Sequence, residues 1–508
     1  MENYTLKAYK NLLNELNLLV TADEASFGEE YVKEMTYNSK EVKPGTLFIC
    51  KGLNFKETYL QEAIERGAIG YVSEEQYSSG AEIAEFIVTD VRVAMPQLAN
   101  LYFNSPSEKL RLIGVGGTKG KTTTVQYIKE IIDAYMEDQG KKPCGILSSI
   151  VTYDGAATSQ ATNTTPEAIE LQRHLANAVE AGLEYMVIEV SSQGLKYNRV
   201  DCVVLDVGVF LNISEDHISP LEHKDFEDYF MSKMKMFEQT KVALVNQDAS
   251  EFNNIFPYAQ KAEKVLTFSK ETEAVDYYGY AMEANIEGTK FKVRSKDFDE
   301  DFELRMPGSF NVENALAAIG ATSGLGIPYE FAQEGLLDVK VSGHMETWVS
   351  KDDLITTIVD YAHNKLSFEA LYPALRKDYP HHHIVGIFGA PGGKARNRRQ
   401  ELGSIAGKYA DEIILTMEDP DNEAIETING VLAEHISVFD TPYLMIDDRG
   451  EAIQHAIHSA TEKTLIVVTG KGHETTQKIA GKYYEMPTDI ERVDQLMKEY
   501  DEKHSNNN

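Results

Sequence analysis

The stretch 111–132 constrains the fold of this chain more than any other part of its sequence. It runs from a short apolar segment, Arg111–Val115, through a glycine-rich turn into a helical pattern that begins at Lys121. Such a turn between a strand and a helix presents backbone N–H groups and a helix N-terminus to phosphate. The spacing predicts that Lys121 reaches the β- and γ-phosphates of a nucleotide and that the Thr122 hydroxyl holds Mg²⁺.

The loop departs from the usual G-x-x-x-x-G-K-[ST] spacing, because Val115 stands where the first glycine belongs. A compressed form, G-x-x-G-x-x-G-K-T, remains from Gly114 to Thr122. An ordinary glycine-rich turn is the alternative interpretation, but such a turn rarely carries Gly-Lys-Thr at the start of a helix. We therefore expect nucleotide contacts from Gly117, Thr118, Lys119, Gly120, Lys121, Thr122 and Thr123.

Composition limits the partners of the chain. Lys and Arg total 49 against 81 Asp and Glu, which gives a formal net charge of −32. This acidity argues against a general surface for nucleic acid or anionic membrane, so any basic site must be local. Cys50, Cys144 and Cys202 lie far apart without metal-type spacing, which favours reduced thiols. The sequence shows no signal region and no membrane-length apolar run, so we expect a cytoplasmic protein without stable membrane insertion.

The length of 508 residues predicts roughly three domains. Residues 1–105 have an α/β pattern. Residues 106–340 begin with the phosphate loop and alternate apolar strands with helices, which indicates a parallel sheet covered on both faces, with a small antiparallel patch at 275–305. Residues 341–508 resemble a doubly wound sheet. We expect strands at 45–50, 68–72, 86–88, 111–115, 145–147, 185–189, 203–210, 242–245, 356–360, 384–388, 412–415 and 465–468, and helices at 59–66 and 311–324.

Polar clusters follow five of the predicted strands, where open parallel sheets bind ligands. One such cluster could be a cap or a turn, whereas five in one chain indicate a site. The clusters are Glu189–Ser192, Asn212 with Asp216 and His217, Asp360–His363, Glu418 with Asp419, and Thr469–Glu474. Glu189 and His217 are candidate Mg²⁺ ligands, although His217 could instead be packed beside a helix cap formed by Asp216. Lys233 lies in an amphipathic helical pattern that by itself predicts a surface lysine.

Taken together, these residues resemble the Mur ligase family, and most closely its MurE branch, over nearly the whole chain. The resemblance rests on Gly114–Thr123, Asn163–Glu167, Glu189–Ser192, Asn212 with Asp216 and His217, Pro307–Asn314, Asp360–His363 and Gly470–Glu474. Members of that branch add the third residue of the peptidoglycan stem peptide to UDP-N-acetylmuramoyl-L-alanyl-D-glutamate. The resemblance implies an N-terminal domain for the uridine end, a central ATPase and a C-terminal Rossmann-like domain that closes over the site.

The resemblance also implies roles for individual residues. Ser39 matches a uridine-contacting serine. Thr122 and Glu189 match ligands of one Mg²⁺, and His217 and Lys233 match a second site in which the family lysine is carbamylated, because a carbamate offers a hard metal an anionic oxygen. The matched muramoyl-dipeptide contacts are Asn163, Thr164, Thr165, Ser191 and Arg199, and the matched nucleotide contacts are Asn311, Asn314, Asp360 and His363. The implied catalytic set is Lys121, Glu189, His217 and Lys233.

Three positions depart from the family pattern. Gln193 replaces a usual histidine after Glu-Val-Ser-Ser, and Lys40 replaces a common arginine near the uridine. His344 replaces the arginine that follows the interdomain glycine, which leaves an ATP contact to Lys340 or another residue.

The acceptor amino acid is predicted from charge. Branch members that use meso-diaminopimelate carry Asp-Asn-Pro-Arg, where this chain has Glu418-Asp-Pro-Asp421. An aspartate repels a carboxylate and attracts an ammonium group, which favours L-lysine. We expect Arg399 to hold the α-carboxylate bidentately and Glu474, in the motif that starts at Gly470, to hold the α-amino group, with Glu418 and Asp421 near the far end. The cations of Ala395–Arg399 leave a differently built diaminopimelate pocket open.

The reaction implied by the resemblance has two steps. The D-glutamate γ-carboxylate attacks the γ-phosphoryl group of ATP, and the amine of the incoming amino acid then attacks the acyl phosphate. Lys121 and two Mg²⁺ ions offset the negative charges. Two alternatives are another amide ligase of the superfamily, such as folylpolyglutamate synthase, and a P-loop regulatory ATPase that binds a cell-wall precursor without joining anything. A monomer is the family expectation.

Overall fold

The computed structural model describes residues 4–22, 29–52, 55–77, 83–161, 163–216, 218, 222–285, 288–306, 308, 311–337, 339 and 343–505. The chain divides into two compact units. The first contains residues 1–276 and 317–332, and the second contains residues 277–316 and 333–508. The division runs through α9 (Asn311–Gly324) and α10 (Tyr329–Leu337). The three-domain boundaries expected from the sequence remain a prediction.

The N-terminal part of the first unit is a five-stranded sheet in the order β1-β5-β4-β3-β2. Its strands are β1 (Leu19–Ala22), β2 (Glu34–Thr36), β3 (Thr46–Ile49), β4 (Ala68–Ser73) and β5 (Ala84–Val88). Only β1 runs antiparallel to its neighbour within this sheet. The accompanying helices are α1 (Leu6–Glu15), the short turn η2 (Ser39–Glu41), α2 (Glu57–Glu65), α3 (Val91–Tyr102) and η3 (Pro106–Lys109). The strands and the helix expected in this region are confirmed.

A larger sheet in the same unit holds the phosphate loop. Within the unit its strands follow the order β13-β12-β11-β6-β10-β7-β8-β9, and those from β13 to β7 are parallel. The strands are β6 (Arg111–Gly116), β7 (Gly145–Leu147), β8 (Val151–Tyr153), β9 (Thr158–Gln160), β10 (Tyr185–Glu189), β11 (Leu205–Phe210), β12 (Thr240–Asn246) and β13 (Lys264–Ser269). β6 and β10 are almost wholly buried, as expected for a parallel sheet covered on both faces.

Helices connect these parallel strands. They are α4 (Lys121–Asp138), α5 (Ala168–Ala181), α6 (Ser192–Lys196), α7 (Phe226–Met234), η4 (Lys235–Gln239) and α8 (Phe252–Ala259). α5 also packs against the N-terminal sheet, because Ala168, Ile169 and Ala176 are buried in the hydrophobic cluster of that sheet. One face of α5 therefore belongs to the core of the preceding part of the unit.

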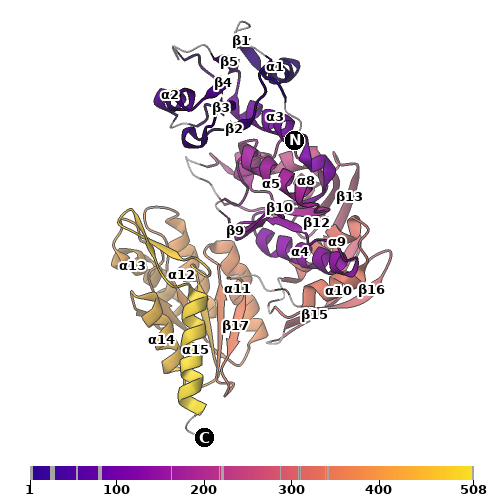
Figure 1. Cartoon of the computed structure of the whole chain (residues 1–508). Helices are drawn as coiled ribbons and strands as arrows, with labels where there is room; N and C mark the ends of the chain where they lie inside the picture. Colours follow the sequence, from indigo (N-terminus) through magenta and orange to yellow (C-terminus); the bar gives the residue numbers. More distant parts are fainter. Residues whose placement is uncertain are drawn as a thin grey trace. The chain divides into compact units, whose positions relative to one another are not determined.

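The second unit contains a doubly wound sheet in the order β17-β18-β22-β19-β20-β21, which is parallel except for β17. Its strands are β17 (Glu346–Val349), β18 (Ile355–Asp360), β19 (His383–Phe388), β20 (Glu412–Leu415), β21 (Tyr443–Met445) and β22 (Thr464–Thr469). Its helices are α11 (Lys365–Asp378), α12 (Asn397–Tyr409), α13 (Ile425–Ile436), η5 (Ser437–Phe439), α14 (Arg449–Ser459) and α15 (Asp489–Ser505), the yellow helix of Figure 1. The expected doubly wound arrangement is confirmed.

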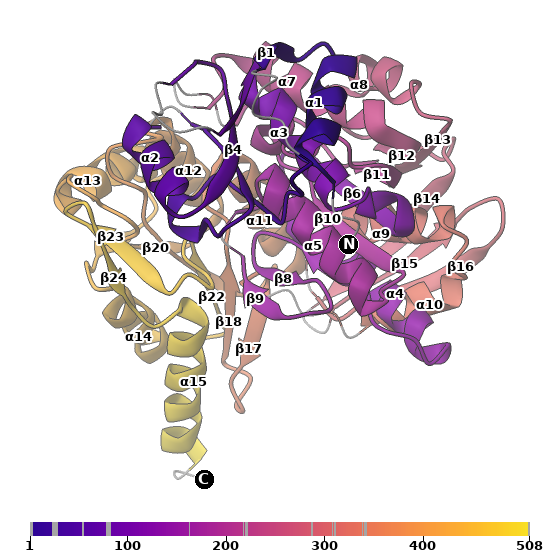
Figure 2. The same cartoon turned by 45° about the horizontal axis from the view of Figure 1, so that its top comes forward.

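Two antiparallel additions complete the second unit. β14 (Tyr277–Asn285), β15 (Gly288–Arg294) and β16 (Asp299–Leu304) form the antiparallel patch expected at 275–305. β23 (Thr476–Ile479) and β24 (Lys482–Glu485) form a separate hairpin, drawn in yellow in Figure 2.

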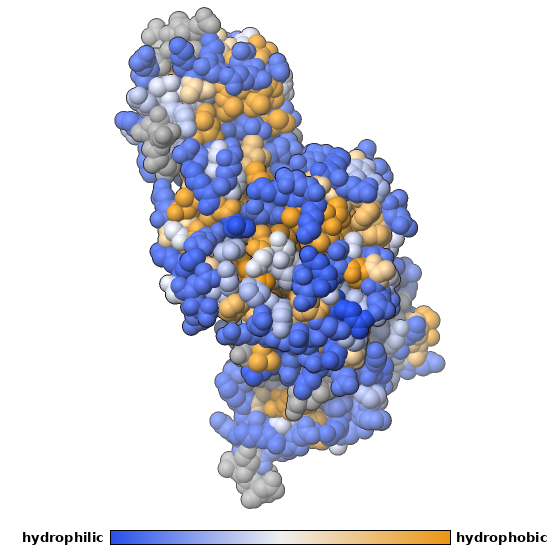
Figure 3. Space-filling model, turned by 90° about the vertical axis from the view of Figure 1, so that its right-hand side faces the viewer, coloured by the Kyte–Doolittle hydropathy of each residue, from blue (hydrophilic) through white to orange (hydrophobic). Residues whose placement is uncertain are grey.

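The face in Figure 3 is mainly hydrophilic, and its apolar residues gather in small groups. None of the helices in the described ranges combines the length and the apolar character needed to cross a bilayer.

A buried ion pair joins the starts of two helices in the second unit. Arg449, the first residue of α14, donates from Nε to Asp489 Oδ1 at 2.6 Å and from Nη2 to Oδ2 at 2.7 Å. The two side chains are 2% and 0% exposed. Asp489 also accepts from the backbone N–H of Gly472 at 3.0 Å, so the pair fixes the loop that follows β22.

Replacing Arg449 by Met should lower the free energy of unfolding by about 3–5 kcal/mol, because an uncompensated carboxylate then stays buried. Urea unfolding followed by circular dichroism measures the change. Lys463→Met is the matched control, since Lys463 pairs with Asp353 at 2.7 Å on the exposed surface. Equal unfolding midpoints for the two variants would contradict the prediction.

Candidate active site

The phosphate loop adopts the strand–turn–helix geometry expected from the sequence. β6 ends at Gly116, and α4 begins at Lys121. Gly117 has φ +146°, and a Cβ there would lie 3.0 Å from Leu211 Cβ. Gly120 has φ +82° at the start of the helix. Glycine is required at both positions because side chains disfavour these backbone angles.

Asn212 fixes the loop from the neighbouring strand. Its Oδ1 accepts from the backbone N–H groups of Thr118 at 3.1 Å and Lys119 at 2.9 Å, and its Nδ2 donates to Lys119 O at 3.2 Å. The Lys119 ammonium lies 3.3 Å from Asp216, on the same segment. The sequence indicated Asn212 only as a polar residue after a strand. Its contacts with the loop depend on the pairing of β11 with β6, which brings the ends of these strands together.

Two lysines converge on one carbonyl oxygen of the loop. Lys121 Nζ donates to Gly117 O at 3.2 Å and to Thr118 O at 3.1 Å. Lys233 Nζ donates to Gly117 O at 2.6 Å and lies 4.8 Å from the ring centroid of Tyr229. Lys233 is only 2% exposed, so the surface position predicted from the helical pattern is wrong. The pattern misled because α7 is short and is covered by the loop on the face that carries Lys233.

Burial of these lysines disfavours their charged forms. It lowers the pKa of Lys121. Burial first, and the neighbouring Lys121 cation second, holds the pKa of Lys233 well below its usual range. Burial of this kind shifts a lysine toward its neutral, nucleophilic amine, and an anion that enters the site shifts it back toward the charged form.

A group of oxygen atoms lies at the end of β10. Glu189 is 1% exposed, and its Oε1 accepts from Ser149 N at 2.8 Å and from Ser149 Oγ at 3.1 Å. The Ser149 and Thr122 hydroxyl oxygens are 2.9 Å apart. Burial raises the pKa of Glu189. A buried carboxylate beside two hydroxyls fits a hard divalent cation, which prefers oxygen ligands.

The expected second metal site is only partly described. His217 lies outside the described residues, and Lys233 is in place as given above. Within the described ranges, no three or more His, Cys, Asp or Glu side chains gather as a metal site.

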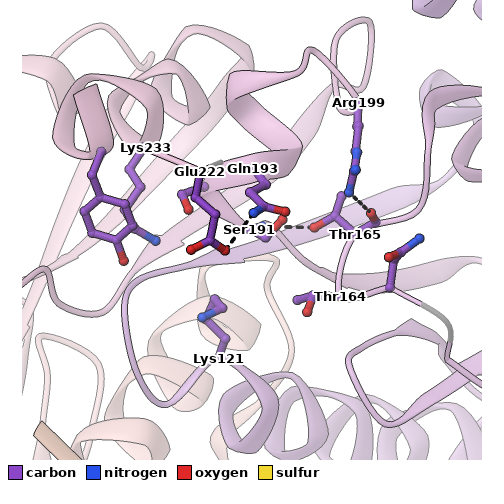
Figure 4. A pocket seen from close by; sticks show the side chains of 11 residues that line it. Lys121, Thr164, Thr165, Ser191, Gln193, Arg199, Glu222 and Lys233 are labelled. Carbon is purple, nitrogen blue, oxygen red and sulfur yellow. Dashed lines mark hydrogen bonds between the residues drawn. The ribbon is translucent and has the colours of Figure 1, made fainter. Parts of the chain in front are cut away.

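One pocket gathers all five residues predicted to bind the muramoyl dipeptide, together with Lys121 of the phosphate loop (Figure 4). Thr165 organises it, because its Oγ1 donates to Glu189 O at 2.8 Å and accepts from Ser191 N at 3.0 Å. Arg199 Nη1 donates to Thr165 O at 3.1 Å. The lining residues are Lys121, Asn163, Thr164, Thr165, Ser191, Ser192, Gln193, Arg199, Glu222, Tyr229 and Lys233.

Gln193 and Glu222 add a polar pair that the sequence did not indicate. Gln193 Nε2 donates to Glu222 Oε1 at 2.9 Å, and Lys196 Nζ donates to Glu222 O at 2.7 Å. Figure 4 shows the Glu222 carboxylate pointing into the same space as Lys121 and Lys233. The residue that replaces the family histidine thus orients a carboxylate in the pocket.

Ser39 does not line this pocket. It is buried in η2 of the N-terminal sheet, where its hydroxyl donates to Glu62 Oε2 at 2.7 Å. A serine that donates its only proton to a carboxylate keeps its lone pairs available as acceptors.

The second unit holds the residues predicted to contact the nucleotide from the C-terminal side. Asp360, at the end of β18, accepts from the backbone N–H groups of Met345 at 3.0 Å and Ala362 at 2.8 Å. Burial raises the pKa of Asp360 to about 6. His344, at the position of the missing arginine, lies 3.9 Å from Asp360. Asn311 and Asn314 are buried in the first turn of α9, and His363 Nδ1 is 2.7 Å from Tyr361 O.

Arg399 is already paired within the chain. Its two Nη atoms contact the two oxygens of Glu423, each at 2.7 Å, and Nη2 also donates to Pro391 O at 3.1 Å. The Arg399 guanidinium holds the pKa of Glu423 down to about 2. The expected bidentate contact with an acceptor carboxylate would require Arg399 to exchange partners.

Asp421 is paired as well. It has φ +51°, and its Oδ2 lies 2.9 Å from Lys478 Nζ. The negative charge of Asp421, which was predicted to attract the ammonium of the acceptor, is therefore offset in the structure by Lys478 of β23.

Lys471 connects the other residues predicted for the acceptor. It is 1% exposed and contacts Glu474 and, at 2.9 Å, Asp419. Tyr361 OH donates to Glu474 Oε1 at 2.6 Å. Gly470 faces the Glu418 side chain, since a Cβ on it would lie 3.9 Å from Glu418 Cγ. The sequence singled out the motif and not the lysine within it.

Comparison with known proteins gives consistent matches. The sequence models described as "Mur ligase middle domain" and "Mur ligase, glutamate ligase domain" match residues 115–322 and 345–472. A UDP-N-acetylmuramoyl-L-alanyl-D-glutamate–L-lysine ligase of Enterococcus faecalis is 37% identical over 90% of each chain. The corresponding 2,6-diaminopimelate ligase of Caldanaerobacter subterraneus is 36% identical over 89% of this chain and 92% of its own. A solved diaminopimelate ligase structure superposes with a TM-score of 0.67 at 26% identity, covering 95% of this chain and 97% of its own.

Glu418 should make stability depend on pH. Burial first and the Asp419 charge second raise its pKa from 4.5 to about 7. The neutral carboxyl is thus favoured by folding, and its contribution is complete below its ordinary pKa and lost as pH rises through about 7.

Between pH 5 and pH 8 the wild type should therefore lose more unfolding free energy than Glu418→Gln, by a difference on the order of 3 kcal/mol. Urea unfolding at both pH values measures it. Parallel losses in the two proteins would show that Glu418 ionises at its ordinary pKa.

Proposed function

The chain belongs to the Mur ligase family, and on that premise we propose that it joins L-lysine to UDP-N-acetylmuramoyl-L-alanyl-D-glutamate using ATP. The product is an amide between the lysine amine and the D-glutamate γ-carboxyl group, formed together with ADP and phosphate. Because ATP is the second substrate, we place the reaction in the cytoplasm. We also propose that it acts as a monomer, as the resemblance to the family implies.

The observation that carries this proposal is the position of the phosphate-loop lysine. Lys121 lines one pocket together with Asn163, Thr164 and Ser191. A carboxylate held by these polar groups lies within reach of a γ-phosphate held by the loop. Positioning of this kind supplies much of the rate in phosphoryl transfer.

The first step brings two anions together. Lys121 and the loop N–H groups bind the β- and γ-phosphates, and Arg199 holds a carboxylate of the muramoyl dipeptide. These cations reduce the repulsion between the γ-carboxylate and the triphosphate. The γ-carboxylate oxygen then attacks phosphorus, and ADP leaves with the electrons of the broken bond.

Mg²⁺ is the cofactor that the residues fit. Thr122 and Glu189 would hold one ion, and His217 with a carbamylated Lys233 would hold another. The neutral amine of Lys233 can add CO₂ and lose a proton, which gives a carbamate oxygen ligand. When bound, Mg²⁺ neutralises phosphate charge and polarises the phosphoryl oxygens.

The second unit supplies the nucleotide and acceptor contacts. We assign Asn311, Asn314, Asp360 and His363 to ATP. In the second step the neutral lysine amine attacks the acyl phosphate carbonyl and releases phosphate. We assign the α-amino group to Glu474, the α-carboxylate to Arg399, and the far ammonium to Glu418 and Asp421, beside Gly470. Ser39, oriented by Glu62, accepts from the uracil N–H.

The acceptor could instead be meso-diaminopimelate. Two observations favour it: the 36% identical relative that uses diaminopimelate, and the Lys478 cation that already pairs with Asp421. Folylpolyglutamate synthase shares the fold at 16% identity, with a TM-score of 0.61. That likeness concerns the fold alone and gives no support to folate as a substrate.

Lys121→Ala and Lys233→Ala should each lower ligation by roughly a hundredfold or more, because each removes a group that balances or binds charge in the transition state. Product formation is measured by chromatography of the UDP-linked peptide. Lys235→Ala is the matched control and should ligate like the wild type, because Lys235 is exposed at the start of η4, two residues after Lys233. Undiminished product from either of the first two variants would refute their role.

In a competition among L-lysine, meso-diaminopimelate and L-ornithine, L-lysine should be incorporated ahead of meso-diaminopimelate, because Glu418 and Asp421 favour an ammonium over a distal carboxylate. Mass spectrometry of the UDP-linked product identifies the winner. Asp421→Arg should shift incorporation toward diaminopimelate. Preferential use of diaminopimelate by the wild type would reverse the assignment. ATP hydrolysis without any amide product would favour the regulatory ATPase.

A further inference from the structure

Glu167 is an acidic residue at a helix start that does not cap its helix. It immediately precedes α5, and its side chain accepts no hydrogen bond from the first-turn N–H groups. Ser, Thr, Asp and Asn are the side chains that usually accept such a bond, so Glu167 leaves its carboxylate available for other contacts. Its two oxygens instead contact two cations, Lys51 Nζ at 2.5 Å and Arg199 Nη2 at 2.7 Å.

The two cations come from different parts of the first unit. Lys51 follows β3 of the N-terminal sheet, and its side chain is 15% exposed. Its Nζ lies 4.3 Å from the ring centroid of Tyr37, which follows β2. Burial first, and the charge of Glu170 in the first turn of α5 second, raise the pKa of Tyr37. The start of α5 is therefore held to the N-terminal sheet by charged and polar contacts as well as by its apolar face.

Arg199 is the member of this group that faces the pocket. It lines the pocket of Figure 4, and its Nη1 is fixed by Thr165 O. Its Nε is buried without a hydrogen-bond partner among the described residues. Lys51, Glu167 and Arg199 carry two positive charges and one negative charge, so one positive charge remains after internal pairing. The closer Glu167 lies to Lys51, the less it neutralises the charge of Arg199.

We propose that Lys51 is a positioning residue for the muramoyl-dipeptide site. By sharing the Glu167 carboxylate, it prevents Glu167 from neutralising Arg199 and leaves the guanidinium able to attract a substrate carboxylate. This inference rests on the proposed function, in which Arg199 holds that carboxylate. Lys51 belongs to the N-terminal sheet, which is expected to bind the uridine of the substrate. Through Glu167, this lysine would control the charge of Arg199, which is proposed to bind the peptide part of the same substrate.

Lys51→Met should weaken binding of UDP-N-acetylmuramoyl-L-alanyl-D-glutamate by about five- to tenfold, the size expected when one partly buried charge contact is lost. Titration calorimetry on the full chain measures it. Binding of ATP should change by less than about twofold, because the phosphate loop keeps its own cations. Lys51→Arg should restore binding. Lys56→Met, which removes a nearby exposed lysine, is the control and should bind like the wild type.

A double-mutant cycle separates positioning from direct contact. In a Glu167→Gln background, Lys51→Met should alter binding by less than about twofold, because Glu167 carries the effect. An equal loss in both backgrounds would mean that Lys51 touches the ligand itself, which overturns the proposal. Unchanged binding by Lys51→Met would also overturn it. If Lys51→Met fails to fold by circular dichroism, Lys51→Gln takes its place in the cycle.

Failure of the proposed function would look different. A wild-type chain that does not bind the UDP-muramoyl dipeptide would sink the function itself. A wild type that binds, with Lys51 variants that bind equally well, would sink only the positioning role.

Discussion

The central constraint in this structure is the burial of two lysines against one backbone carbonyl. Lys121 and Lys233 both donate to Gly117 O, and burial disfavours the charge on each. Bringing two cations into a low-dielectric site is unfavourable unless anions accompany them. Negative charge at the phosphate loop would therefore stabilise the charged forms of both lysines, and the proposed triphosphate and carboxylate would supply it. Glu189, on the neighbouring strand β10, brings one negative charge close to these lysines. A local group of buried cations is also how a chain with net charge −32 could attract anionic ligands.

α5 connects this site to the rest of the first unit. Its apolar face packs in the core of the N-terminal sheet, while the residues just before it, Thr165 and Glu167, touch Glu189 and Arg199. A displacement of α5 would thus move polar contacts in the pocket and apolar contacts in the N-terminal core at once. Coupling through a shared rigid element needs no long chain of intermediates.

Local patterns gave most of the fold. The strands at β6, β10, β11, β18 and β22 were expected because buried apolar runs and turn residues are properties of neighbouring positions. The phosphate loop followed from its glycines. Contacts between distant positions could not be obtained in this way. The pattern predicted a surface position for Lys233 because the carbonyl oxygen that it contacts lies 116 positions away in the sequence. Asn212 contacts the phosphate loop only because strand pairing brings the two segments together. The pairing of Arg399 with Glu423, 24 positions apart, was missed for the same reason.

The acceptor side shows why a single substituted charge is an incomplete guide to specificity. The replacement of an arginine by Asp421 predicts a negative charge that is available to the acceptor. In the structure Lys478 offsets that charge, and burial raises the pKa of Glu418 to about 7. Lys471 contacts the carboxylates of Asp419 and Glu474. The local field at the acceptor therefore depends on pairs of residues from the Glu418–Asp421 turn, the Gly470–Glu474 loop and β23. A lysine ammonium that enters beside Glu418 would stabilise the ionised carboxylate and release a proton, which couples acceptor binding to pH. Preference for an ammonium group would therefore depend on the protonation state of Glu418 as much as on the residue at position 421.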